Sequence, residues 1–216
     1  MEKYSLKDVN RVYSSCSMSP VNYKIGSYVT FLAKENFLRK KAVNNLDLVL
    51  DDKVLDLACG MGYNFDYLRN KIGSDGIIFG VDYIQGMLNA AKKRIGKKGW
   101  HNVRLIKKDA AKLNFPENYF DGIISTIGIS SIPNHKEALK RSITSLKHGK
   151  RIVILDGKLF NGFYKIFNPL LGFTRWSASW DKNKDIIADA KKLLKDVVIE
   201  EYLGGSFFII TGVKKR

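Results

Sequence analysis

The chain of 216 residues has few cysteines and prolines and no long apolar run. Cys16 and Cys59 are far apart and form no CxxC pair, which argues against a disulfide framework or structural zinc and suits a reducing compartment. No stretch approaches the ~18 apolar residues of a membrane span, and the first residues lack the apolar segment of a secretory signal. We therefore expect a soluble, cytoplasmic protein without a bound metal.

Basic residues outnumber acidic ones by 37 to 21, which gives a net charge of +16. The excess is spread along the chain, and its densest run, residues 92–98, falls at the end of an expected helix. Cations there favour the helix dipole and usually face solvent. The alternative is attraction to an anionic membrane or to nucleic acid. Peripheral membrane contact is thus one open interpretation, and nucleic acid is the less favoured partner.

From about residue 53, strand-like and helix-like runs alternate, as in a parallel sheet covered on both faces. The expected strands are Val54–Leu57, Ile77–Val81, Val103–Ile106, Gly122–Ser125 and Ile152–Leu155. The expected helices are residues 28–45, Tyr63–Ile72, Ile84–Ile95 and Lys136–Leu146. A C-terminal hairpin is expected from Val197–Tyr202 and Phe207–Val213.

The segment VLDLACGMGYN (54–64) runs from a strand through a loop with Gly60 and Gly62 into a helix. Glycine lets a ligand approach the backbone, and open sheets bind ligands beyond the carboxyl ends of their strands. A GxG pair is also common in ordinary turns. Phe65 stands where a dinucleotide fingerprint has a small residue, and Asp56 suits an ammonium group better than a pyrophosphate. A nicotinamide-dependent oxidoreductase is therefore disfavoured.

Acidic residues follow the second and third expected strands. Asp82 lies 22 residues after Gly60, close to the ~20 expected of an acid that binds ribose hydroxyls, although it would also cap a helix. Asp109, followed by Ala110, is placed to accept a hydrogen bond from an adenine amino group or to be an ordinary loop residue. Residues 125–128, after the fourth strand, could line the same ligand.

Together these segments resemble the class I methyltransferases that use S-adenosylmethionine. The resemblance rests on VLDLACGMGYN, GVDYIQGML, KDAAKLNF and FDGIISTIGISSIP and covers roughly residues 40–156 plus the hairpin. It implies a Rossmann-like three-layer α/β sandwich whose mostly parallel seven-stranded sheet ends in an antiparallel hairpin. It implies S-adenosylmethionine as cofactor. The residues expected at the cofactor are Tyr23, Asp56, Ala58, Cys59, Gly60, Gly62, Asn64, Asp82, Tyr83, Met87, Asp109, Ala110 and Thr126.

A finer resemblance is to the ubiquinone/menaquinone-biosynthesis and bacterial phosphatidylethanolamine N-methyltransferases. It rests on FLRKKAVNNLDL, IGISSIP and EEYLGGSFFIITG. It implies a small-molecule or lipid-like acceptor, either a quinone precursor or a phospholipid head group. The chain departs from many such sequences at Tyr23-Lys24, where they have Tyr-Asp, and this weakens the transfer of N-terminal roles.

We expect a single methyltransferase domain over 1–216, divided into an N-terminal helical segment (1–46), a cofactor-binding core (47–157), an aromatic lid (158–183) and a terminal helix with hairpin (184–216). The lid segment is rich in aromatic residues, and its expected acceptor contacts are Tyr164, Phe167 and Trp176. A lid that excludes water would favour methyl transfer. The alternatives are that these aromatics fill the core or rest on a membrane.

The sulfonium carbon is already activated, so positioning of the acceptor can suffice without a strong base. The candidate bases are Asp156 at the end of the fifth strand and His135 near the fourth. Two rival functions stay open. An RNA methyltransferase would explain the charge, but no RNA-binding module or NPPY tetrapeptide is visible. A non-catalytic binding protein has little reason to keep the glycines and acids above together. The oligomeric state is not indicated.

Overall fold

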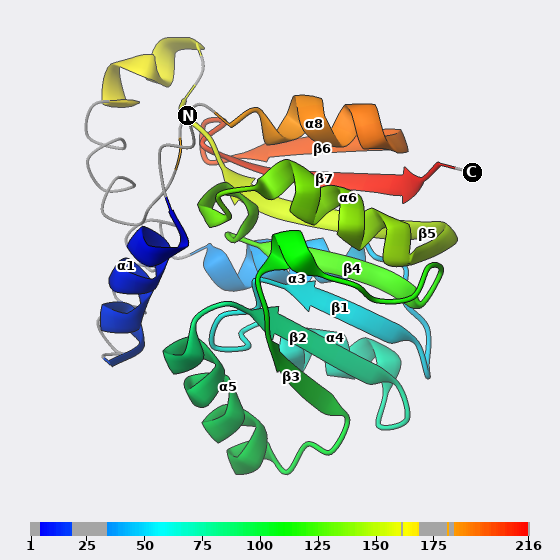
Figure 1. Ribbon diagram of the computed structural model, residues 1–216. Coiled ribbons are helices and arrows are strands. Elements are labelled where there is room, and N and C mark those ends of the chain that lie inside the picture. Colours follow the sequence, from blue (N-terminus) through cyan, green and yellow to red (C-terminus); the bar gives the residue numbers. More distant parts are fainter. Residues whose placement is uncertain (1–4, 19–33, 161, 169–180, 182–183, 216) are drawn as a thin grey trace.

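The computed structural model describes residues 5–18, 34–160, 162–168, 181 and 184–215 (Figure 1). Its centre is a seven-stranded sheet in the order β3-β2-β1-β4-β5-β7-β6. The strands are β1 (Lys53–Leu57), β2 (Ile77–Asp82), β3 (Val103–Lys107), β4 (Phe120–Thr126), β5 (Leu146–Gly157), β6 (Leu194–Tyr202) and β7 (Phe207–Lys214). Strands β1 to β5 are parallel, and β7 pairs antiparallel with β5 and β6. The expected sheet and terminal hairpin are confirmed.

Helices cover both faces of this sheet. On one face lie α3 (Glu35–Asn44), α4 (Phe65–Ile72) and α5 (Gln85–Lys98), and on the other α6 (His135–Ser145) and α8 (Ile186–Leu193). Short 3-10 turns follow three strands: η1 (Ala110–Lys112), η2 (Ile129–Ser131) and η3 (Gly162–Phe167). The helix α1 (Leu6–Met18) lies outside these layers, against α5 (Figure 1).

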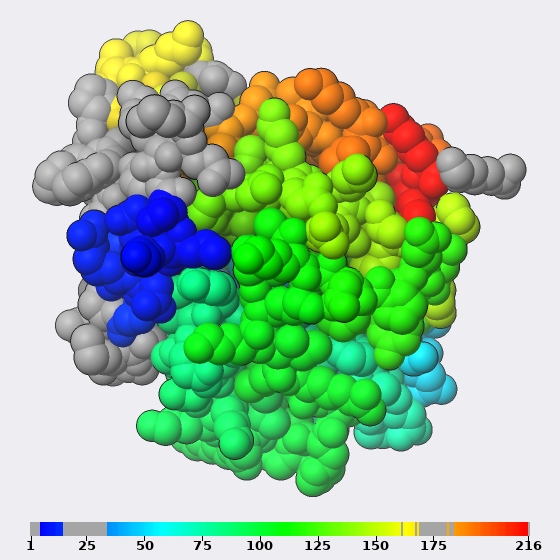
Figure 2. Space-filling view, viewed as in Figure 1, coloured from blue at the N-terminus to red at the C-terminus, as the bar shows by residue number. Residues whose placement is uncertain are grey.

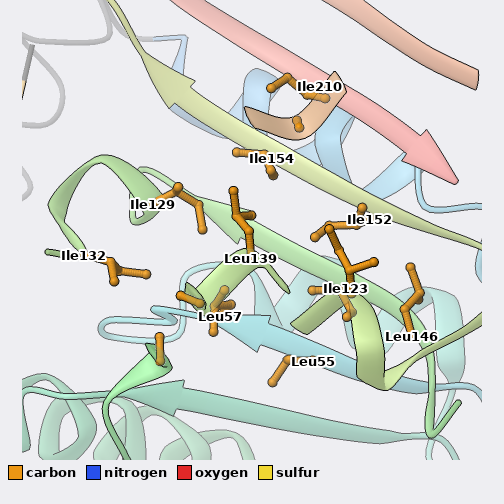
Figure 3. Close-up of a cluster of buried hydrophobic side chains, with 14 of the residues drawn as sticks. Leu55, Leu57, Ile123, Ile129, Ile132, Leu139, Leu146, Ile152, Ile154 and Ile210 are labelled. Carbon is orange, nitrogen blue, oxygen red and sulfur yellow. The ribbon is translucent and has the colours of Figure 1, made fainter. Parts of the chain in front are cut away.

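The core follows from the alternation of side chains along each strand. Val54 and Ile124 point to the α3–α5 side, whereas Leu55 and Ile123 point to the α6–α8 side. Figure 3 shows the hydrophobic cluster on the α6–α8 side, which contains Leu55 and Ile123, between α6 and the sheet. Both faces of the central strands are therefore apolar, as expected of parallel strands covered by helices on both sides.

Three elements differ from the sequence-based expectation. β5 begins at Leu146, directly after α6, because its first residues pair with β4 through an irregularity near Phe120. α3 is described from Glu35 onward, and residues 28–33 of the longer expected helix lie outside the described residues. α1 falls within the expected N-terminal helical segment (1–46), although no separate helix was predicted at residues 6–18. Within the part of the chain that the structure describes, no helix has the length and apolarity needed to cross a bilayer.

The strand order places a topological switch between β1 and β4. The chain moves outward from β1 to β2 and β3, then returns to the other side of β1 as β4. The loops that leave β1 and β4 therefore diverge and open a crevice at the carboxyl edge of the sheet, where such folds bind ligands.

Candidate functional site

A pocket of about 800 Å³, counting the space open to solvent, lies at this edge. Its walls come from α1, α3, the loops after β1, β2 and β3, and the β4–α6 connection. The described residues that line it are Leu6, Val9, Tyr13, Arg39, Ala58, Cys59, Gly60, Met61, Tyr63, Val81, Asp82, Tyr83, Ile84, Met87, Lys108, Asp109, Ala110, Thr126, Ile127, Gly128, Ser131, Ile132 and Pro133.

The loop after β1 owes its shape to its two glycines. Gly60 has φ +54°, and a Cβ at this position would meet no atom within 4 Å, so the backbone is open toward a ligand. Gly62 has φ +75°, and a Cβ there would lie 2.4 Å from Cε2 of Phe65. The Phe65 ring also lies 2.8 Å from the position that a Cβ on Gly80 would take. Phe65 therefore fills the space that a dinucleotide fingerprint leaves to a small residue.

A hydrogen bond to Asp82 connects this loop to the end of β2. One carboxylate oxygen accepts a hydrogen bond from the backbone N–H of Gly60 at 2.8 Å, and the other accepts from the N–H of Ile84 at 2.9 Å. Burial raises the pKa of Asp82, and these backbone hydrogen bonds oppose the rise. Asp82 thus lies in the pocket wall and bonds the residue before α5, and its expected ribose contact stays a prediction.

Asp109 occupies the corresponding place after β3. Its carboxylate accepts a hydrogen bond from the N–H of Ala111 at 2.9 Å and so caps η1. Asp109 and Ala110 both line the pocket. The ammonium group of the neighbouring Lys108, also in the wall, is hydrogen-bonded to Asn114.

A buried polar network lies beside the pocket. The amide nitrogen of Asn64 donates to both oxygens of Asp56, at 3.0 and 3.1 Å, and to Thr126 Oγ1 at 3.0 Å. Arg39 donates to Asn64 Oδ1 at 3.0 Å, to Glu35 Oε1 at 2.7 Å and to Thr126. Burial raises the pKa of Asp56 to about 7, although the Asn64 hydrogen bonds and the Arg39 charge lower it.

The backbone at the end of β4 is strained. Ile127 has φ +56°, a conformation that costs a β-branched residue about 1–2 kcal/mol. Its N–H donates to the carbonyl of Leu155 at 2.7 Å, which holds the turn in place. A Cβ on the next residue, Gly128, would lie 2.6 Å from Cβ of Ala58, which itself has φ +55°. Two tight turns therefore meet at the floor of the pocket.

Helix α1 closes one side of the pocket. Val9 is buried in a small cluster with Met61, Ile84 and Met87, and Figure 2 shows α1 (blue) on the surface next to the start of α5. The Tyr13 hydroxyl and Ser131 Oγ are 2.9 Å apart and hydrogen-bonded. α1 thus spans from the β2 side of the pocket to the β4 side.

The two candidate bases lie outside the described pocket wall. His135 is buried, with Nε2 2.9 Å from Asp189 Oδ2, and it joins α6 to α8. Burial lowers the pKa of His135, against the effect of the Asp189 hydrogen bond. Asp156 is buried and accepts hydrogen bonds from the N–H and hydroxyl of Ser130 at 2.9 and 2.7 Å. Asp156 therefore holds the β4–α6 connection through Ser130, whereas His135 ties α6 to α8.

The pocket brings together most of the residues expected at the cofactor. Those that line it are Ala58, Cys59, Gly60, Asp82, Tyr83, Met87, Asp109, Ala110 and Thr126. Asp56 and Asn64 lie beside it in the polar network, and Gly62 packs on Phe65. Tyr23 lies outside the described residues. Their contacts with a cofactor stay predictions.

The expected acceptor residues lie elsewhere or outside the description. Tyr164 is half exposed on η3 and does not line the described pocket. Phe167 ends η3, its side chain is not described, and Trp176 lies outside the described residues. Sequence reasoning missed Arg39 and the contribution of α1 to the pocket wall. Glu35 and Arg39 stand four residues apart within the expected first helix, a spacing that places both on one face and could have suggested a buried ion pair.

Comparisons with known proteins agree with this geometry. The family described as a methyltransferase domain matches residues 54–149. A demethylmenaquinone methyltransferase of Listeria welshimeri is 25% identical over 173 residues, with 76% of this chain and 72% of that protein covered. A protein of the same name from Shouchella clausii is 24% identical, with 89% and 91% covered.

Solved structures share the fold. A SAM-dependent methyltransferase from Aquifex aeolicus aligns with a TM-score of 0.59 at 18% identity, covering 88% of this chain and 98% of that one. Phosphoethanolamine N-methyltransferase 2 of Haemonchus contortus, solved with S-adenosyl-L-methionine, aligns with a TM-score of 0.71 at 16% identity, covering 85% and 53%. At these identities the likeness concerns the architecture.

Proposed function

We propose that this chain, which is a class I S-adenosylmethionine-dependent methyltransferase, methylates an apolar acceptor of the quinone-precursor type. The observation that carries the proposal is the division of the pocket into two unlike halves. The half at β1, β2 and β3 contains an open glycine backbone and two carboxylates, from Gly60, Asp82 and Asp109. The half after β4 is lined by Ile127, Ile132 and Pro133, and its Tyr13 and Ser131 hydroxyls are hydrogen-bonded to each other.

The first half fits S-adenosylmethionine. The open space at Gly60 would admit part of the cofactor against the protein backbone. Asp82 and Asp109 are placed to accept hydrogen bonds from its ribose and adenine. Met61, Ile84 and Met87 supply apolar surface for the adenine ring. When bound, the cofactor supplies a methyl group on a positively charged sulfur.

The second half suits an apolar acceptor better than a phospholipid head group. Ile127, Ile132 and Pro133 line this part of the pocket. A phosphate would need a cation, and the two in the described wall, Arg39 and Lys108, already have polar partners. The relatives named demethylmenaquinone methyltransferase support an acceptor of the quinone-precursor class.

The chain's contribution to the reaction is orientation and exclusion of water. Ala58 in the turn after β1 would border the cofactor and Ile127 in the turn after β4 would border the acceptor, with α1 against the pocket, an arrangement that would favour methyl transfer by orientation and exclusion of water. The acceptor would gain the methyl group, the sulfur would leave as the neutral thioether, and the acceptor's proton would pass to water. His135 and Asp156 are bonded to Asp189 and Ser130 outside the described pocket wall, so neither is placed to take a proton from an acceptor in the pocket.

A lipid-like acceptor also implies contact with a membrane surface. On η3, Phe163 and Ile166 are 81% and 65% exposed, and Lys165 lies between them. Figure 1 shows η3 (yellow) and α1 (blue) at the same end of the molecule, where the parallel strands end. We assign this exposed turn to peripheral contact with an anionic bilayer.

The test is calorimetric titration with S-adenosylhomocysteine, followed by a methyl-transfer assay with reduced demethylmenaquinone and with phosphoethanolamine. The expected result is binding in the micromolar range, about −8 kcal/mol, and transfer to the quinone precursor alone. Transfer to phosphoethanolamine alone would reverse the acceptor assignment. Absence of nucleoside binding would reject the assignment of the pocket.

A further inference from the structure

The turn after β4 contains a positive φ angle at Ile127, a residue type that rarely adopts this backbone conformation. Ile127 is β-branched and has φ +56°, whereas glycine or asparagine is the usual residue in this region. Such a conformation persists only where the surroundings fix it, and strained residues gather at ligand sites. The hydrogen bond from Ile127 N–H to Leu155 and the close contact between Gly128 and Ala58 supply that fixation.

Ile127 also has a distinctive place in the pocket. Strand β4 lies on the side of β1 opposite to β2 and β3, so its terminal turn is separated from Asp82 and Asp109 by the strand order. Ile127 lines the pocket and is only half buried, while part of its side chain packs on the α3–α5 core cluster. A branched side chain anchored in this way has few rotamers and presents a rigid apolar surface.

We propose that Ile127 is a specificity-determining residue, whose side chain contacts the apolar face of the acceptor and sets its position beside the cofactor. This inference rests on the proposed function. Ile127 lines the pocket while being anchored on the core, and neither glycine nor alanine would supply an apolar contact of this size. The same arrangement disfavours binding of polar acceptors, because the Ile127 side chain offers them no hydrogen bond.

The experiment compares I127A with I127G. Alanine keeps the strain and loses the contact, whereas glycine loses both. The probe is 1-naphthol, a neutral aromatic ring system with one hydroxyl, titrated in the presence of saturating S-adenosylhomocysteine. Both variants are expected to bind 1-naphthol about tenfold more weakly than the wild type and S-adenosylhomocysteine equally well. The melting temperature of I127G should exceed that of I127A by about 2–4 °C.

The control is L203G in the turn between β6 and β7, where Leu203 has φ +52° and lies outside the described pocket wall. It relieves similar strain and should leave 1-naphthol affinity unchanged. A direct readout is the ¹³C-methyl NMR signal of Ile127, identified by its loss in I127A, which should shift when 1-naphthol is added.

Unchanged 1-naphthol affinity in I127A would overturn this inference while leaving the proposed function intact, and so would an I127G no more stable than I127A. A wild type that binds S-adenosylhomocysteine but not 1-naphthol would overturn both the acceptor class and the role of Ile127. A wild type that binds no S-adenosylhomocysteine would reject the proposed function itself.

Discussion

At the scale of single residues, Asp82 does more than a ribose contact requires. Its carboxylate holds the N–H of Gly60 and the N–H of Ile84, so one side chain sets the shape of the glycine loop and of the entry to α5. Hydrogen bonds to a charged acceptor contribute about 1.5–3 kcal/mol each. D82A should therefore weaken S-adenosylhomocysteine binding by tenfold or more in calorimetry, with D82N intermediate. The exposed Asp75 provides the control D75A, and equal affinities in D82A and D75A would contradict this role.

Asp56 gives a pH dependence of known sign. Burial raises its pKa to about 7 in the folded state, against 3.8 for the free side chain. The folded protein therefore binds the proton more tightly than the unfolded chain does. The resulting stabilisation is fully present below about pH 4 and is lost as the pH rises through 7.

D56N removes this titration. Between pH 4 and pH 8 the free energy of unfolding of D56N should rise relative to the wild type by about 2–4 kcal/mol, measured by urea denaturation. D51N, which changes an exposed aspartate in the loop before β1, should follow the wild-type curve. If the free energies of unfolding of D56N and wild type change in parallel with pH, Asp56 has the same pKa in the folded and unfolded states.

At the scale of elements, sequence reasoning expected an N-terminal helical segment but not the position of α1 at the pocket. Its segment LKDVNRVYSSCSM is mostly polar, and Val9 is buried only because Met61, Ile84 and Met87 provide a surface for it. V9D should detach α1 and weaken S-adenosylhomocysteine binding about tenfold, since burying such a side chain contributes about 1.5–3 kcal/mol. The sheet should keep its melting temperature because α1 lies outside its layers.

The matched control for V9D is N10D, which introduces the same charge at the exposed neighbouring position. Hydrogen exchange of residues 5–18 should slow when S-adenosylhomocysteine binds to N10D and should stay fast in V9D. If V9D binds the nucleoside as tightly as N10D, α1 is not part of the cofactor site.

The elements that sequence reasoning did predict share one physical property. The central strands are short, apolar and followed by glycine or an acid, so local pattern alone locates β1 and β2 to within a residue or two. The pairing of β7 between β5 and β6 follows from the hairpin. The positions of Arg39, Val9 and Tyr13 could not be predicted, because each depends on contacts with residues more than twenty positions away.

At the scale of the whole molecule, the proposed membrane contact would combine the net charge of +16 with the exposed turn η3. Attraction to an anionic bilayer acts over about a Debye length and weakens with salt, whereas insertion of Phe163 and Ile166 adds a short-range apolar term. We expect binding to phosphatidylglycerol-containing vesicles in sedimentation assays to fall steeply between 50 and 300 mM salt, while neutral vesicles bind weakly at any salt concentration.

Charge alone would give the same salt dependence for any orientation of the molecule, so the apolar term decides which end faces the bilayer. F163S/I166S should bind anionic vesicles about tenfold more weakly, because two exposed apolar side chains are lost at the end of the molecule where the parallel strands end (Figure 1). V49S/L50S removes Val49 and Leu50, which are 59% and 70% exposed just before β1, at the opposite edge of the sheet, and should bind as the wild type does. Equal losses in the two variants would mean that the surface charge holds the protein without orientation, and a lipid-like acceptor would then have to reach the pocket through water.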